Sequence, residues 1–320
     1  MLVTGASGLI GTFLIDLLMY RNSVFNDGIS IFAVSRNKEK ISACFKDYFD
    51  SKYFIFVQQD IQTPLQINDS VDYIIHCASY CHPIAFSTEP INIILTSVLG
   101  TKSVLDFACQ KNVKRTIFLS SSEIYGENRG DTKAFNEQYC GNLDCNTLRA
   151  CYPEGKRAAE TLCQAYIRER NIDVVIARPC HVYGPSFGDY DSKVIAQFIR
   201  NAVNGEKITL KSKGDQEFSY CYSGDICSAL IILLLKGERG QAYNISDDSG
   251  HLSLLQIAEI LSQHAGTEIF FDTPSITESS GYSRQVKALV DSSKLQKLGW
   301  KPGYPVKDGI KRTVDILRYN

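Results

Sequence analysis

The chain has 320 residues, of which 44% are hydrophobic and 22% are charged, and its formal net charge is −1. A chain of this length has room for one large domain or two modest ones, each with an ample core. Its near-zero charge excludes a general attraction to nucleic acid or to an anionic membrane surface. Any anionic ligand therefore has to be held by local donors, and neither nucleic acid nor a membrane is expected as a partner.

The cysteine content bears on the cellular compartment. There are 11 cysteines, an odd number, and none of them belongs to a Cys-x-x-Cys pair. Several, such as Cys77, Cys163 and Cys227, lie in apolar stretches and are typical of small core residues. This pattern favours reduced thiols over a disulfide framework. No signal peptide is visible, and the apolar run 229–235 is too short to cross a bilayer, so a cytoplasmic protein is expected.

Short runs of β-branched and aromatic residues alternate with amphipathic helical patterns through the first half of the chain. The expected strands are 1–3, 29–35, 53–57, 71–77, 116–120 and 174–177. The expected helices are 9–21, 38–49, 91–111 and 152–170. Strands that alternate with helices indicate right-handed crossovers and a parallel, doubly wound sheet of the α/β class.

The rhythm changes after residue 178, where prolines and glycines punctuate the sequence. Helices are expected at 193–204, 225–235 and 254–263, and short strands at 208–211, 242–245 and 268–271. We assign residues 1–178 and 218–246 to the doubly wound domain, and residues 179–217 and 247–320 to a smaller mixed α/β lobe. The first strand has only three residues before the first turn, which indicates either a start upstream of Met1 or a domain boundary in a longer polypeptide.

A glycine-rich turn, Gly5-x-x-Gly8-x-x-Gly11, follows the first strand. Gly5 permits a tight turn, Gly8 lets the backbone approach a phosphate, and Gly11 lets the next helix pack closely. The spacing differs by one residue from the usual Gly-x-Gly-x-x-Gly pattern, and the alternative is an incidental glycine-rich turn. Its position between an apolar strand and an apolar-faced helix favours a dinucleotide-binding Rossmann domain. The expected pyrophosphate site consists of Gly5, Ser7, Gly8, Leu9, Ile10 and Gly11.

The end of the second strand bears on which dinucleotide binds. An acidic residue there would hold the ribose hydroxyls of NAD, but the sequence has Ser35-Arg36. Arg36 beside Ser35 favours the 2′-phosphate of NADP; in the alternative, Arg36 stacks on the adenine or caps the loop. Asp60 and Ile61, after the third strand, are placed to meet the adenine edge. The expected cofactor is NAD or NADP, with Arg36 favouring NADP.

Tyr152 and Lys156 stand one helical turn apart, and Ser121 lies at the carboxyl end of the fifth expected strand. An unperturbed tyrosine has a pKa of about 10, so it is a weak base at neutral pH. A nearby ammonium group and a cationic nicotinamide favour the phenolate, and Ser121 can share the substrate proton. The alternative is an ordinary exposed pair, but the glycine turn and Ser121 at these separations favour removal of a hydride and a proton from an alcohol.

The chain resembles the extended short-chain dehydrogenase/reductases, in particular the NAD-dependent epimerase/dehydratase group that acts on nucleotide sugars. The resemblance rests on the glycine turn, His76-Cys77-Ala78-Ser79, Ser121 with Tyr125-Gly126, Tyr152/Lys156 and Arg178-Pro179. Within the group, the segment from Arg149 to Glu160 is similar to that of the UDP-glucuronate decarboxylases, whose Thr-Ser-Glu motif corresponds to Ser121-Ser122-Glu123.

The resemblance implies a mechanism, further site residues and an assembly. Tyr152, aided by Ser121 and Lys156, would remove the C4 hydroxyl proton while C4 loses a hydride, and the resulting 4-keto sugar permits decarboxylation, dehydration or epimerisation. Glu123 would act near C5 as an acid/base group; the alternative is an anchor for the strand end. The cofactor site would also include Cys77, Ala78, Ser79, Tyr152, Lys156, Pro179 and His181. A homodimer is expected through the helices 91–111 and 152–170.

Two departures from the group's pattern concern the anion site. Phe218 replaces the arginine that contacts the nucleotide diphosphate in the group's pattern. In a second motif of the group, which corresponds to residues 180–186, His181 replaces an asparagine and Ser186 replaces an arginine. A desolvated diphosphate favours charge-assisted donors, so Arg149, Lys193, Lys211 or His181 is expected to compensate. The expected substrate contacts are Ser122, Arg149, His181, Lys193, Phe218 and Tyr220. No metal is expected, because the histidines lack ligand spacing.

Two alternatives remain open. Arg36 and the altered anion site would suit an NADPH-dependent reductase of a nucleotide-linked sugar or alditol precursor. The other alternative is a non-catalytic dinucleotide-binding protein, because fold does not fix function. Retention of Ser121, Tyr152 and Lys156 speaks against this second alternative.

Overall fold

Seven parallel strands form the large sheet of the molecule, whose computed structural model describes residues 1–81, 83–188, 191–274 and 286–319. The strands are β1 (Leu2–Thr4), β2 (Ile31–Ser35), β3 (Phe54–Gln58), β4 (Tyr73–His76), β5 (Arg115–Leu119), β6 (Val174–Pro179) and β10 (Ala242–Ile245). They lie in the order β10-β6-β5-β4-β1-β2-β3. Every pair in this order is parallel, which confirms the predicted doubly wound α/β sheet.

The strand order reverses at β1. From β1 the chain proceeds to β2 and β3 on one side, whereas β4, β5 and β6 follow on the other side. In the register of the central strands, Thr4 lies opposite both Val34 and His76. Open α/β sheets bind ligands in the crevice at the carboxyl ends of strands where such a reversal occurs. This topology locates the site beside the turns that follow Thr4 and His76.

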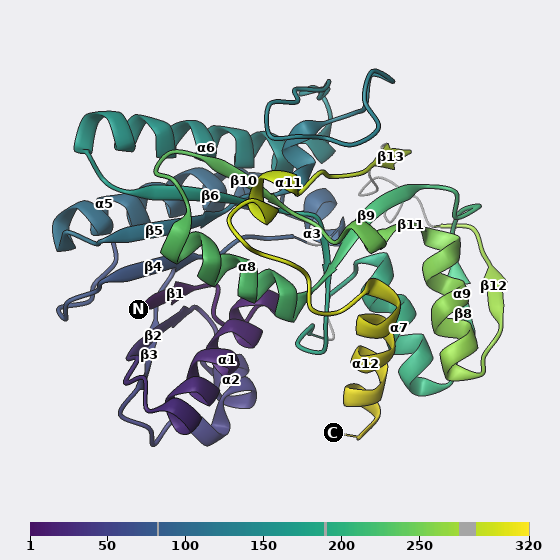
Figure 1. Ribbon diagram of the computed structural model, residues 1–320, viewed down its shortest axis with the longest axis horizontal. Helices are drawn as coiled ribbons and strands as arrows, with labels where there is room; N and C mark the ends of the chain where they lie inside the picture. The colour runs from purple at the N-terminus through teal and green to yellow at the C-terminus, as the bar shows by residue number, and fades with distance from the viewer. Residues whose placement is uncertain (82, 189–190, 275–285, 320) are drawn as a thin grey trace.

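Helices cover both faces of the large sheet (Figure 1). α5 (Thr101–Lys111) and α6 (Cys151–Arg170) lie on one face, and α1 (Leu9–Phe25) and α8 (Ser223–Lys236) lie on the other. Strand residues such as Val3, Ile75 and Val175 are fully buried between these layers. Burying an aliphatic side chain of this size contributes about 1.5–3 kcal/mol, which explains why the strands are almost continuously apolar.

Two of the predicted helices are interrupted. The helix predicted at 38–49 is α2 (Lys38–Cys44) followed by a 3₁₀ turn at Lys46–Tyr48, because Phe45 leaves the helical conformation and packs into the core. The helix predicted at 91–111 consists of α4 (Pro90–Leu95), a π-helical turn at Thr96–Gly100 and α5. Within the described ranges, Pro90–Lys111 is the one helical run long and apolar enough to cross a membrane, and 56% of its most apolar window is buried. Another helix, α3 (Pro83–Thr88), precedes α4.

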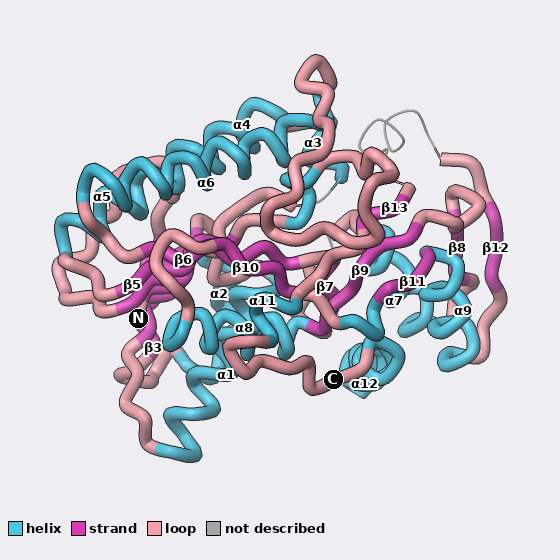
Figure 2. Tube along the Cα trace, turned by 45° about the horizontal axis from the view of Figure 1, so that its top comes forward, coloured by secondary structure: helices cyan, strands magenta, loops and turns pink. Residues whose placement is uncertain are grey.

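A smaller lobe lies beside the carboxyl edge of the large sheet (Figure 2). Its strands are β7 (His181–Tyr183), β8 (Ile208–Leu210), β9 (Glu217–Tyr222), β11 (His251–Ser253), β12 (Ile269–Phe271) and β13 (Lys287–Ala288). Its helices are α7 (Val194–Asn204), α9 (Leu254–Ala265) and α12 (Val306–Tyr319), which share a second core. β9 pairs with β7, β11 and β13, and β8 pairs with β12.

The division of the chain differs in two places from the predicted one. Residues 218–222, predicted to belong to the large domain, are part of β9 and therefore lie in the small sheet. Conversely, α11 (Ser293–Gln296) contacts β10, and Leu295 and Trp300 belong to the core of the large sheet. The strands of the small sheet are too short to show a period in the sequence, so the place of residues 218–222 could not be predicted. The apolar residues after 290 close the open edge of the large sheet at β10.

Candidate active site

The glycine turn lies against the end of β4. Gly5 has a φ of +66°, and a Cβ added to it would be 2.7 Å from the backbone nitrogen of Ala78. A Cβ on Gly11 would be 2.3 Å from the carbonyl oxygen of Gly5, so the first turn of α1 packs directly on the loop. Gly8 occupies the N-cap position without a side chain, and the first turn of α1 contains no acidic residue. The first amides of α1 are therefore available to an anion, which fits a dinucleotide pyrophosphate.

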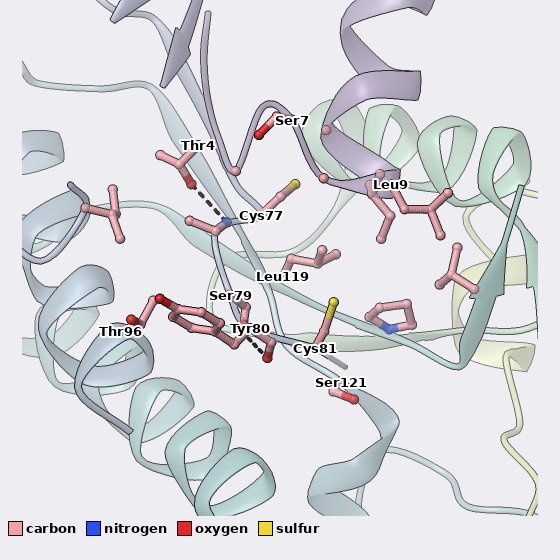
Figure 3. A pocket seen from close by; sticks show the side chains of 18 of the residues that line it. Thr4, Ser7, Leu9, Cys77, Ser79, Tyr80, Cys81, Thr96, Leu119 and Ser121 are labelled. Atoms are coloured by element: carbon pink, nitrogen blue, oxygen red, sulfur yellow. Dashed lines mark hydrogen bonds between the residues drawn. The ribbon is translucent and has the colours of Figure 1, made fainter. Parts of the chain in front are cut away.

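Hydrogen bonds fix the two strand ends that flank this turn. The Thr4 hydroxyl lies 2.7 Å from Nδ1 of His76 and accepts a hydrogen bond from the Ala78 amide (Figure 3). Nε2 of His76 lies 3.3 Å from the Thr101 hydroxyl. Burial lowers the pKa of His76 to about 3, so the ring is neutral. His76 is a buried structural tie, and the residues after it form the cavity wall.

Arg36 lies at the end of β2 and faces two partners. Its guanidinium donates a hydrogen bond of 2.8 Å to the Tyr80 hydroxyl and lies 3.6 Å from the Asp60 carboxylate. Ser35, next to it, lies 3.1 Å from Ser7 of the glycine turn. Tyr80 was not predicted from the sequence, although it directly follows the expected segment ending at Ser79. The cluster brings one cation and one anion to the expected adenosine end.

One cavity of about 440 Å³ joins the glycine turn to the predicted catalytic residues. Figure 3 shows Ser7 and Leu9 at one side of this cavity and Cys81 and Ser121 at another. Its wall includes the predicted residues Gly5, Ser7, Gly8, Leu9, Ile10, Gly11, Ser35, Arg36, Asp60, Ile61, Cys77, Ala78, Ser79, Ser121, Ser122, Glu123, Tyr152, Lys156, Pro179, His181 and Lys193. The volume and mixed polarity of this wall are typical of a ligand site.

Three predicted substrate residues do not line this cavity. Arg149 lines a separate pocket of about 70 Å³ behind Glu123. Phe218 and Tyr220 lie in the core of the small lobe behind His181, with ring centroids 4.6 and 5.6 Å from the imidazole. Alternation along β9 explains this, because both residues point to its covered face. The structure therefore does not place Phe218 and Tyr220 where they could contact a substrate in this cavity.

Tyr152, Lys156 and Ser121 converge at the carboxyl end of β5. Lys156 donates a hydrogen bond of 2.7 Å to the carbonyl of Leu119, and burial lowers its pKa to about 8. Burial raises the pKa of the Tyr152 phenol, while a hydrogen bond with Ser121 and the charge of Lys193 act in the opposite direction. The site thus holds a phenol, a hydroxyl and a titratable amine within one buried constellation, as proton transfer to and from an alcohol requires.

A second basic residue, Lys193, faces this constellation from the small lobe. It is the N-cap residue of α7, and its Nζ lies 3.2 Å from the Asp191 carboxylate and 3.5 Å from the Cys81 sulfur. Burial alone lowers the pKa of Lys193, but Cys81 and Asp191 outweigh it and raise the pKa overall. By contrast, burial lowers the pKa of His181 to about 4, so that ring is neutral. Lys193 is therefore a permanent cation at the expected substrate end.

A buried network supports the catalytic turn from below. Glu160 accepts hydrogen bonds from the Ser120 hydroxyl and from two nitrogens of Arg178. Arg178 also donates to the Tyr125 hydroxyl, which donates to Asn244 in β10. The family resemblance rests on segments that contain Glu160, Tyr125 and Arg178. The spacing of these three residues in the sequence does not indicate that their side chains meet. This network fixes the strand end from which Ser121 projects.

The remaining sequence predictions concern metals and thiols. In the described parts of the chain, His, Cys, Asp and Glu side chains form no group of three or more that is arranged to hold a metal ion. All 11 cysteines are free thiols.

The model of the NAD dependent epimerase/dehydratase family matches residues 1–246. The chain belongs to this family. It is 30% identical over 319 residues to UDP-glucuronic acid decarboxylase 1 of Xenopus tropicalis, covering 99% of this chain and 72% of that protein. It is also 31% identical over 311 residues to UDP-glucuronic acid decarboxylase 6 of Arabidopsis thaliana, covering 97% and 86%. The predicted membership of the family is confirmed.

Two solved structures share the fold over nearly their whole length. The UDP-glucuronic acid 4-epimerase from Bacillus cereus, solved with UDP-glucuronic acid and NAD, has a TM-score of 0.83 at 20% identity and covers 99% of this chain and 98% of that one. The dTDP-glucose 4,6-dehydratase from Streptomyces venezuelae, solved with NAD, has a TM-score of 0.83 at 24% identity and covers 100% and 97%. Identities this low support the shared fold rather than a particular substrate.

Proposed function

We propose that this enzyme of the NAD dependent epimerase/dehydratase family oxidises a nucleotide sugar at C4 and returns the hydride within the same catalytic cycle. The observation that carries the proposal is that Ser121, Tyr152 and Lys156 share one cavity with the glycine turn. A pyrophosphate at the turn and an alcohol at Tyr152 are then held in one pocket, so binding supplies the orientation that hydride transfer needs. Bound NAD would supply the hydride acceptor and donor.

The residues of the chain divide the proton chemistry among them. Tyr152 takes the C4 hydroxyl proton, and Ser121, which is hydrogen bonded to it, positions that hydroxyl. Lys156, with a pKa of about 8, is mostly an ammonium ion at neutral pH, and its Nζ lies 6.0 Å from the Tyr152 ring centroid, so we assign it the role of favouring the phenolate through its charge. Because burial raises the pKa of Tyr152, the neutral phenol is also competent to return the proton at the end of the cycle.

Glu123 and Lys193 define the substrate end of the proposal. Glu123 borders the cavity next to Ser121 and is the carboxylate available for the step at C5 that follows C4 oxidation. Lys193 borders the cavity together with its ion-pair partner Asp191, and we assign it to the diphosphate or to an acidic sugar in place of the arginine that Phe218 replaces. The names of the relatives suggest UDP-glucuronic acid as the first substrate to test.

The surroundings of Arg36 favour NAD over NADP. The Asp60 carboxylate at 3.6 Å already faces the guanidinium and opposes a second anion there. The family to which the chain belongs is described as NAD dependent. We therefore no longer take Arg36 as favouring NADP, as we did from the sequence alone.

Mass spectrometry of small molecules released from the purified protein, followed by assays with UDP-glucuronic acid, UDP-glucose and dTDP-glucose, tests the proposed function. We expect released NAD and conversion of a nucleotide sugar with no net change in nicotinamide absorbance. Consumption of NADPH mole for mole would instead establish a reductase. Binding of dinucleotide without conversion of any nucleotide sugar would leave the non-catalytic alternative.

We also infer that the protein is a cytoplasmic homodimer. Apolar side chains on α3, α4 and the π-helical turn, and one before α6, are exposed: Ile84, Ile91, Ile94, Leu95, Leu99 and Leu148. Such a patch is unusual on a monomer and supports self-association along α4, α5 and α6. Sedimentation of the wild type and of an Ile91→Glu, Leu95→Glu variant tests this, with a shift from dimer to monomer expected.

A further inference from the structure

Arg149 has three neighbours that link the two sides of the candidate active site. Its guanidinium forms an ion pair with Glu123, and both side chains are mostly buried. The same guanidinium lies over the Phe86 ring, 4.4 Å from its centroid. Phe86 in turn stacks on the Tyr152 ring, with centroids 5.0 Å apart and planes 24° apart. One arginine therefore contacts the carboxylate directly and the phenol through a single aromatic ring.

The two cavities show from which side Arg149 acts. Glu123 borders both the large cavity and the pocket of about 70 Å³, whereas Arg149 borders only the small one. Phe86 is likewise not part of the wall of the large cavity. Arg149 and Phe86 thus lie behind Glu123 and Tyr152, on the side away from the glycine turn. An arginine in this place reaches a bound sugar only through the residues in front of it.

We propose that Arg149 is a positioning residue that holds the Glu123 carboxylate toward C5 of the sugar, with the Phe86 ring fixing the plane of the guanidinium. This inference rests on the proposed function, because it assigns Arg149 to the step after C4 oxidation. It replaces the expectation that Arg149 binds the substrate diphosphate.

The physical argument is one of geometry. A guanidinium is planar and presents its donors as a fork, and an aromatic face below it leaves the ion pair one preferred direction. A lysine in the same place is a point charge that keeps the attraction but not the plane. Nε of Arg149 is buried without a hydrogen-bond partner, so the ion pair with Glu123 is the main polar contact of this group. Without the arginine, Glu123 is free to rotate away from the large cavity.

The test compares two half-reactions in Arg149→Met and Arg149→Lys. Reduction of bound NAD on mixing with the nucleotide sugar reports C4 oxidation, and product formation reports the complete cycle. For Arg149→Met we expect product formation to fall about 100-fold, the lower range for losing a general acid or base, while NAD reduction changes less than about 3-fold. The reduced cofactor then accumulates in the steady state. Arg149→Lys is expected to keep about 10-fold more turnover than Arg149→Met, because it retains the tethered charge without the planar fork. Added guanidinium ion is expected to restore about 10-fold in Arg149→Met, because it supplies the planar fork without the tether.

Arg157 provides the matched control. It lies on α6, which directly follows the 3₁₀ turn Leu148–Ala150 that carries Arg149, and it donates hydrogen bonds to the carbonyls of Ile124 and Gly141, so it supports the same turn without contacting the Glu123 side chain. We expect Arg157→Met to lower stability without accumulation of reduced cofactor. Equal loss of both half-reactions in Arg149→Met, or a variant that turns over like the wild type, would overturn the inference. A wild-type enzyme that never reduces its NAD with any nucleotide sugar would instead overturn the proposed function.

Discussion

The two ends of the large cavity are built in different ways. The pyrophosphate part of the cofactor end consists of backbone: the turn at Gly5, the uncapped start of α1 and the segment after β4 at Ala78. The substrate end consists of side chains from separate segments, among them Glu123, Tyr152 and Lys193. A site built from backbone leaves no room for an added atom, but it makes few demands on which side chains are present. A site built from side chains needs each chemical group in place. The consequence is that the two ends are expected to fail in different ways.

Tyr152→Phe is expected to show the largest effect and to disable the substrate end alone. Removal of the hydroxyl deletes the proposed acid/base group, whose loss costs about 100- to 10,000-fold in turnover. Dinucleotide binding should be unchanged, because the Phe86–Tyr152 ring contact does not need the hydroxyl. Steady-state kinetics and calorimetric titration with NAD check the two halves of this statement. A Tyr152→Phe enzyme with wild-type turnover would remove the tyrosine from the mechanism.

Gly5→Ala is expected to disable the cofactor end. Gly5 has a φ of +66° and its added Cβ meets the Ala78 backbone at 2.7 Å. Gly130 has a φ of +82° but has no atom within 4 Å of an added Cβ, so Gly130→Ala carries the same backbone strain without the clash. We expect Gly5→Ala to lose about 1–3 kcal/mol more stability than Gly130→Ala and at least about 10-fold in NAD affinity. Equal losses in both variants would show that only the φ angle matters.

Lys156 links stability at the substrate end to pH. Burial lowers its pKa from 10.5 to about 8, so the folded protein binds fewer protons than the unfolded chain between these values. The free energy of unfolding contributed by this group therefore rises with pH through the window, by at most about 1.4 kcal/mol per pH unit, and is constant below it. Chemical denaturation of wild type and Lys156→Met across this range checks the sign. The stability difference between them should change only inside the window.

Arg36→Ala is expected to have the smallest effect and to sharpen the description of the cofactor end. The residue contacts Tyr80 and Asp60 at the rim of the cavity rather than the pyrophosphate turn. We expect NAD affinity to change less than about 5-fold, because an exposed charge pair contributes at most about 1 kcal/mol. A large loss of NADP affinity together with a low wild-type NADP dissociation constant would restore the assignment to NADP.

The features that could be predicted from the sequence are those set by local spacing, and those that could not depend on contacts between distant segments. The sheet, the glycine turn and the Tyr152–Lys156 pair could be predicted because each is set by local spacing: apolar runs, a glycine pattern and one helical turn. The positions of Phe218 and Tyr220 could not be predicted. Which face of β9 they occupy in the fold depends on the pairing of β9 with β7, and the residues near them do not specify this pairing. Arg149 was expected at the diphosphate, but its contacts with Glu123 and Phe86 join segments far apart in the sequence.

A nucleotide sugar with deuterium at C4 measures the proposed chemistry most directly. If Tyr152, Ser121 and Lys156 support C4 oxidation with return of the hydride, turnover should be slowed by the label and the deuterium should remain in the sugar product. Product in which the C4 deuterium has been lost to solvent, or conversion with no isotope effect on the reduction of bound NAD, would contradict this mechanism.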